Sequence, residues 1–219
     1  MVAPVPTPIE LTAAEREALR AAAAQDAPEL AARLDGPVDV VQIDQHYFPH
    51  HRILEVTSRA PLPSLRVHVA IGPIGTKILT GHSQHLHAMC DADPIQESLG
   101  ARQRALDYAA AAYAWTDDAP PGEVVLNFVE ELVWPSDPSE ALRARIQLFL
   151  ALYRDRIEPQ TQRHTNLGWE LRFYVISEGR LIDRRLHLPF DGKLFRDDEV
   201  VTTSIPMTES VPAATPGVS

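Results

Sequence analysis

Short runs in which apolar and polar residues alternate restrict the fold more than any other feature of this sequence. The clearest run places apolar residues at every second position, at Leu65, Val67, Val69 and Ile71. Successive side chains of a strand point to opposite faces, so such a run has one buried and one solvated face. The Gly72–Gly75 turn leads directly into a second short run over 76–80, which predicts a β-hairpin.

Further strands are predicted along the chain by the same reasoning, at 38–44, 52–57, 124–128, 169–175 and 180–188. Glu178 and Gly179 form a tight turn between the last two, which makes a second hairpin. Because hairpins are grouped and do not alternate singly with helices, the fold class is predicted to be α+β. We expect a mostly antiparallel sheet built from hairpins, with two to three helices packed on it.

Three segments carry the signals of a helix start. Thr12 and Glu15 have the spacing of a capping box, and the alanine-rich stretch that follows predicts a helix to about Ala24. Asp93 and Asp137 are each followed by proline, which is well tolerated at the first helical position because its missing N–H needs no partner there. Two further helices are therefore predicted to begin at Asp93 and at Asp137.

Composition narrows the class of protein. The formal charge is 20 − 30 = −10, which disfavours a general nucleic-acid binder because such proteins need clustered Lys and Arg. Cys90 is the sole cysteine, so no intrachain disulfide can form. No basic and apolar leader begins the sequence, and no apolar run approaches the roughly 20 residues of a membrane span. We therefore expect a cytoplasmic protein with no membrane partner.

Both ends of the chain are rich in proline and poor in core-forming residues. Residues 1–8 are predicted to be a disordered tail and residues 201–219 a flexible tail. No repeat or long linker interrupts the part between them. Residues 9–200 are therefore predicted to form a single α+β domain.

The densest group of potential ligands lies between the second hairpin and Asp93 and consists of His82, His85, His87 and Cys90. Imidazole and thiolate are the usual protein ligands of zinc, iron and copper, and a single well-placed imidazole can bind haem. In a helix, His82 shares a face with His85, whereas in a strand His85 shares a face with His87. At most two or three of the four can therefore bind one metal ion, and a loop of locally hydrogen-bonded histidines is the alternative.

A second group lies between the first two strands and comprises His46, His50 and His51, with Glu55 shortly after. A carboxylate beside an imidazole fixes its tautomer, which suits a general base or an outer-sphere partner of a metal. These four residues are the predicted catalytic residues, and a polar hairpin tip is the alternative. The two segments that carry these groups each follow a strand of neighbouring hairpins, so we expect them to lie close together.

Two functions remain open from the sequence. The first is a metal- or haem-dependent enzyme, an oxidoreductase or lyase, that acts on a small organic molecule in a histidine-lined pocket. The second is a non-catalytic module that binds a small molecule or regulates a partner, with homo-oligomers, including a dimer, compatible with either.

Overall fold

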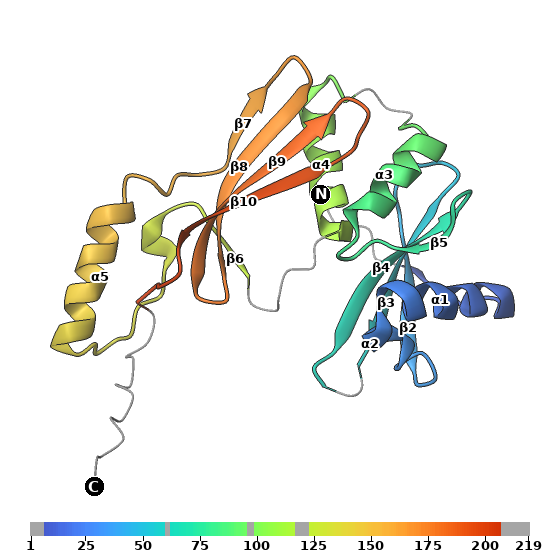
Figure 1. Ribbon diagram of the computed structural model, residues 1–219, viewed down its shortest axis with the longest axis horizontal. Helices are drawn as coiled ribbons and strands as arrows, with labels where there is room; N and C mark the ends of the chain where they lie inside the picture. Colours follow the sequence, from blue (N-terminus) through green and yellow to red (C-terminus); the bar gives the residue numbers. More distant parts are fainter. Residues whose placement is uncertain (1–6, 60–61, 96–98, 117–122, 207–219) are drawn as a thin grey trace, which may run out of the picture. The chain divides into compact units, whose positions relative to one another are not determined.

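The computed structural model describes residues 7–59, 62–95, 99–116 and 123–206 (Figure 1). Residue contacts group the chain into two units. The first unit comprises residues 1–118, 164–170 and 186–195, and the second comprises 119–163, 171–185 and 196–219. Each unit has its own hydrophobic cluster, and the chain forms two antiparallel sheets together with helices, which confirms the α+β class. Units defined by contacts need not fold independently, so the single domain predicted over 9–200 stays a prediction.

The first sheet is a meander in which every strand pairs with its neighbour in the sequence. Its order is β1 (Thr7–Pro8), β2 (Val38–Ile43), β3 (Arg52–Ser58), β4 (Leu65–Gly72) and β5 (Gly75–Ile78). Val40 lies opposite Val56, and Val56 opposite Val67, so one buried apolar row crosses three strands. Thr7 and Pro8 belong to the predicted N-terminal tail, and they pair with β2.

Helices α1 (Ala13–Asp26) and α2 (Pro28–Ala31) lie beside this sheet (Figure 1). The capping box forms as its spacing predicts, since Thr12 accepts a hydrogen bond from the Glu15 backbone and Glu15 accepts one from the Thr12 backbone. Leu19, Ala23 and Leu30 are buried and join the apolar cluster of β2–β5. This packing holds the end of α1 close to the sheet that carries the histidine-bearing loop.

The prediction of a helix that begins at Asp93 is wrong. Helix α3 spans Ser83–Ala92 and ends at Asp93, and the next helix, α4, spans Arg102–Thr116. Pro94 explains the difference, because the residue before a proline avoids the helical conformation and helices commonly end there. The histidine-dense segment, whose conformation the sequence left open, is therefore mostly helical.

The second sheet has the order β10-β9-β8-β6, with β7 also paired to β8. Its strands are β6 (Val124–Leu126), β7 (Thr161–His164), β8 (Gly168–Ser177), β9 (Arg180–Pro189) and β10 (Phe195–Thr202). Helix α5 (Glu140–Tyr153) starts at Ser139, whose hydroxyl accepts the Leu142 N–H, close to the predicted start. A short 3₁₀ helix, η1 (Val129–Glu131), precedes it.

Residues 201–206, the described part of the predicted C-terminal tail, include the end of a strand and a buried side chain. Strand β10 reaches Thr202 and Ile205 is buried in the cluster of the second unit. Residues 201–206 of the predicted tail therefore contribute to this unit, while the rest of that tail lies outside the described residues. None of the described helices has both the length and the apolar character that a membrane crossing requires.

Candidate functional site

The connection between β2 and β3 carries three histidines and is closed by a glutamine. The Gln45 side chain donates to the carbonyl oxygens of Phe48 and His51 at 2.9 and 2.8 Å and accepts the Phe48 N–H at 2.9 Å. Phe48 is fully buried, and its ring lies against Tyr108 of α4. The hydrogen bonds of Gln45 and the packing of Phe48 therefore both hold the loop in place, and they fix the positions of His50 and His51.

The carboxylate of Asp93, at the end of α3, binds both of these histidines. Its Oδ1 lies 3.0 Å from Nδ1 of His50, and its Oδ2 lies 3.1 Å from Nδ1 of His51. The same Oδ2 accepts the backbone N–H of His50 at 2.9 Å. Asp93 is buried, so one carboxylate that is largely removed from water organises two adjacent imidazoles.

The two imidazoles differ in their exposure to solvent. The His51 side chain is 0% exposed and the His50 side chain is 69% exposed. Among the residues that the structure describes, Nε2 of His51 is the one buried side-chain nitrogen or oxygen without a hydrogen-bond partner. Of the pair, His50 is therefore the imidazole that a molecule arriving from solvent can reach.

The environment of Asp93 keeps its carboxylate ionised. Burial acts to raise the pKa of Asp93, but hydrogen bonds from the His50 and His51 side chains and from the His50 backbone outweigh it, so the pKa is lowered. An ionised carboxylate only accepts hydrogen bonds, so each imidazole donates through Nδ1–H. For a neutral His50, this leaves the lone pair on Nε2.

His82, the N-cap residue of α3, and His85 and His87 within the helix each bind a different main-chain carbonyl. His82 Nε2 lies 2.8 Å from the Asp26 carbonyl, and His85 Nδ1 lies 2.6 Å from that of Ile78. The His82 and His85 rings are stacked with centroids 5.3 Å apart. His87 Nε2 instead lies 2.8 Å from the Leu194 carbonyl.

Cys90 is buried and has the thiol 3.7 Å from the Tyr108 hydroxyl. Burial raises the pKa of the Cys90 thiol to about 11. The thiol is therefore protonated at neutral pH, whereas metal binding and nucleophilic attack both require the thiolate.

The predicted metal ligands His82, His85, His87 and Cys90 do not converge on one point. Within the described ranges, no group of three or more His, Cys, Asp or Glu side chains is arranged to hold a metal ion. The stacked His82–His85 pair is what remains of the predicted set, and a metal or haem cofactor stays a prediction.

Two of the predicted catalytic residues lie apart from Asp93. His46 packs on Tyr47 with ring centroids 4.4 Å apart. Glu55 lies in β3 opposite His68 of β4, and its carboxylate is 3.6 Å from Nε2 of His68. The predicted combination of imidazole and carboxylate does occur, but the carboxylate is Asp93, which the sequence pattern had assigned to a helix start.

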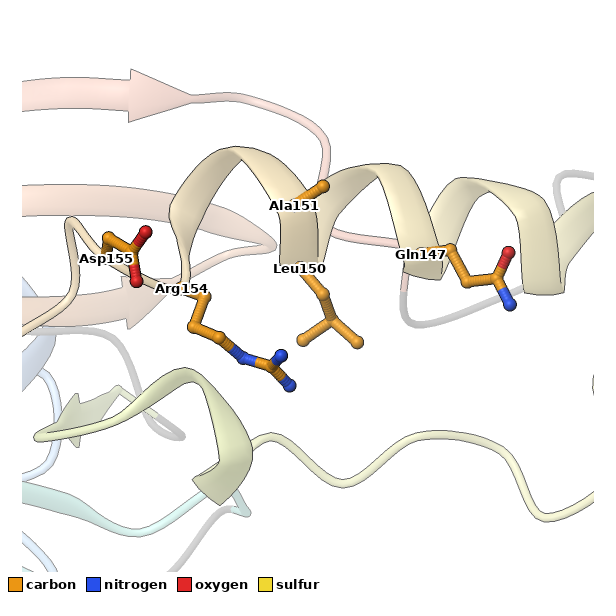
Figure 2. Close-up of a pocket in the computed structure, with 5 residues that line it drawn as sticks. All are labelled: Gln147, Leu150, Ala151, Arg154 and Asp155. Carbon is orange, nitrogen blue, oxygen red and sulfur yellow. The ribbon is translucent and has the colours of Figure 1, made fainter.

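A surface depression of about 400 Å³ lies along α5 in the second unit (Figure 2). Its lining residues are Gln147, Leu150, Ala151, Arg154 and Asp155. The Arg154 guanidinium donates to Glu130 of η1 at 2.9 Å, and both side chains are more than half exposed. Its lining contains none of the predicted site residues and no buried titratable group, so it has fewer groups that could take part in a reaction than the Asp93 site.

Comparisons of the chain with protein-family models, with curated proteins and with solved structures each returned no match.

Proposed function

We propose that this protein is an enzyme that transfers a proton to or from a small organic molecule through His50. The observation that supports the proposal is the bond between a buried carboxylate, Asp93, and Nδ1 of an exposed imidazole, His50. This pairing places an imidazole, a common general acid or base, at the surface and fixes its orientation through its buried side.

In the proposed reaction, His50 is the catalytic residue and Asp93 is a positioning residue. Asp93 holds the tautomer in which Nδ1 carries the proton, so Nε2 can accept a proton from a substrate atom within about 2.6–3.2 Å. The imidazolium that forms lies beside the negative charge of Asp93, which lowers the free energy of the charged state. The same group then returns the proton to the product.

A cofactor forms a separate part of the proposal. Proton transfer by His50 requires no metal, while a zinc, iron or copper ion could use His82 and His85 only together with ligands from water, substrate or elsewhere. Metal analysis and an ultraviolet–visible spectrum of the purified protein test this part. Stoichiometric metal or a haem absorption band supports it, and the absence of both removes it without affecting His50.

Ligand binding monitored by NMR tests the proton-transfer proposal. Mixtures of small organic molecules are added to the protein while the ring signals of all its histidines are recorded. We expect at least one compound class to shift His50 more than His164, an exposed histidine in the same unit. That compound class then becomes the substrate in a turnover assay.

Substitution distinguishes catalysis from simple binding in that assay. His50→Gln should abolish turnover, Asp93→Asn should reduce it, and His164→Gln should leave it unchanged. Binding at His50 with no turnover, or turnover that survives His50→Gln, would contradict the proposal.

A second candidate function is a non-catalytic module that binds a partner or forms a dimer. Exposed apolar surface in the second unit favours it, because large exposed apolar side chains commonly mark interaction sites. Of the eleven large exposed hydrophobic residues in the described part of the chain, seven lie in that unit, namely Val124, Val125, Phe128, Val133, Leu148, Leu152 and Val200. Sedimentation analysis tests the dimer, which should dissociate in a Phe128→Ser variant; a concentration-independent monomer contradicts it.

A further inference from the structure

We infer that His51 and Gly72 are positioning residues that hold Asp93, and through it His50, in the geometry described above. The inference rests on the proposed function for its catalytic meaning. Its structural content concerns the contacts of His51 and Gly72 with Asp93 and His50, and it can be tested without knowledge of the substrate.

His51 restricts Asp93 from the buried side. Its Nδ1 lies 3.1 Å from Oδ2 of Asp93, the oxygen that also accepts the His50 backbone N–H. Because the His51 ring is 0% exposed, no water molecule can readily replace its hydrogen bond if the ring moves. One oxygen of Asp93 is thus fixed by two donors, of which the His51 ring is buried, and this leaves the other oxygen directed at His50.

Gly72 provides the space in which the His51 ring lies. It is the last residue of β4, and the pairing of Arg52 with Ile71 places it beside His51 at the end of the β3–β4 ladder. A Cβ atom added to Gly72 would lie 2.4 Å from Cδ2 and 2.7 Å from Cγ of His51. It would also lie 2.8 Å from the carbonyl oxygen of His50.

Position 72 requires glycine because there is no room for a Cβ atom. All three distances are well below van der Waals contact, and the neighbours are a buried ring and a main-chain carbonyl, neither of which can move freely. An alanine at this position would therefore displace the His51 ring, the backbone of His50, or both. Each displacement changes a hydrogen bond to Asp93.

The tautomer of His50 shows whether His51 and Gly72 hold Asp93 in place, because the hydrogen bond at one ring nitrogen determines which nitrogen carries the proton. ¹⁵N NMR of the ring nitrogens measures it directly. In the wild type, His50 should be in the Nδ1–H form. His51→Ala, which removes the donor to Asp93, should convert His50 to a mixture of tautomers.

Two comparisons separate positioning from general damage to the fold. His51→Asn retains a side-chain N–H close to the place of Nδ1, so it should restore the His50 tautomer that His51→Ala loses. Gly72→Ala should give the same mixture as His51→Ala. Gly36→Ala is the matched control, because its nearest neighbour would be the Arg33 carbonyl at 3.4 Å, an ordinary contact, and it should leave His50 unchanged.

The outcomes distinguish this inference from the proposed function. A His50 that is Nδ1–H in the wild type and stays so in both His51→Ala and Gly72→Ala would overturn the inference while leaving the His50–Asp93 pair intact. A His50 that is not Nδ1–H in the wild type would remove the basis of the proposed function itself. If Gly72→Ala fails to fold, the comparison of His51→Ala with His51→Asn still decides.

Discussion

Replacement of Asp93 by alanine should destabilise the protein far more than replacement of its neighbour Asp91. Asp93 accepts three hydrogen bonds from His50 and His51, whereas Asp91 is 67% exposed and forms a surface ion pair with Lys193. The two carboxylates are separated by one residue, so the comparison isolates the buried contacts.

The size of the expected loss in unfolding free energy depends on which hydrogen-bond donors lose their acceptor when Asp93 is replaced. The Nδ1–H of His51 is buried, and leaving such a donor unpaired costs about 1–3 kcal/mol. The His50 ring is mostly exposed and can bind water, so its loss adds no more than about 1 kcal/mol. Asp93→Ala should therefore lower the free energy of unfolding by about 1–4 kcal/mol, and Asp91→Ala by less than about 1 kcal/mol.

Urea denaturation followed by circular dichroism measures both variants against the wild type. The dependence of the unfolding free energy on urea should stay the same, so that the change appears in the midpoint. A loss for Asp93→Ala within about 0.5 kcal/mol of that for Asp91→Ala would show that the buried carboxylate does not organise the two histidines.

Three further predictions concern the pKa of Asp93 and two other buried groups, Cys90 and Arg184. Because the pKa of Asp93 is lowered, its ionised form stabilises the fold above pH 3.8, and this stabilisation is lost as the pH falls from there through the folded-state pKa. In acid titrations, the difference in unfolding free energy between wild type and Asp93→Asn should therefore shrink over that range. A constant difference would contradict this prediction. Because burial raises the pKa of Cys90 to about 11, iodoacetamide should label it slowly at neutral pH and rapidly in urea; equal rates in both would be inconsistent with a buried thiol. Arg184 is 3% exposed and pairs with Glu123 and Asp198. Arg184→Met should therefore lower the free energy of unfolding by about 3–5 kcal/mol in urea denaturation, whereas Arg185→Met, at a more exposed position, should lower it by less than about 1 kcal/mol. Similar losses for the two variants would contradict this prediction.

Much of the fold could be predicted because its signals are local. The Thr12 capping box depends on residues three positions apart, and the alternation in β4 depends on its own eight residues. Strand β10 was missed because six of its eight residues are exposed, so it lacks the buried alternate positions that mark a strand.

Asp93 shows why the site could be predicted only in part. An Asp-Pro pair is compatible with the start of a helix and with the end of one. The choice depended on whether the preceding histidine-dense segment was helical, which its composition did not decide. The predicted pairing of carboxylate with imidazole was therefore assigned to Glu55, the acid nearest to His51 in the sequence.

The hydrogen-bond partners of His82, His85 and His87 could not be predicted either. His87 binds the Leu194 carbonyl, which lies 107 residues further along the chain. The contact between His50 and Asp93 likewise spans 43 residues. Neither spacing corresponds to a local pattern, and only the tertiary fold determines which imidazole finds which partner.

The reactivity of His50 towards diethyl pyrocarbonate, resolved by mass spectrometry, tests the proposed role of the Asp93–His50 pair most directly. The reagent attacks the lone pair of a neutral imidazole, and Asp93 keeps that lone pair on the accessible Nε2 atom. We predict that His50 reacts several-fold faster than the exposed His164, and that the difference disappears in Asp93→Ala. A His50 that reacts no faster than His164, or whose rate is unchanged by Asp93→Ala, would contradict the account.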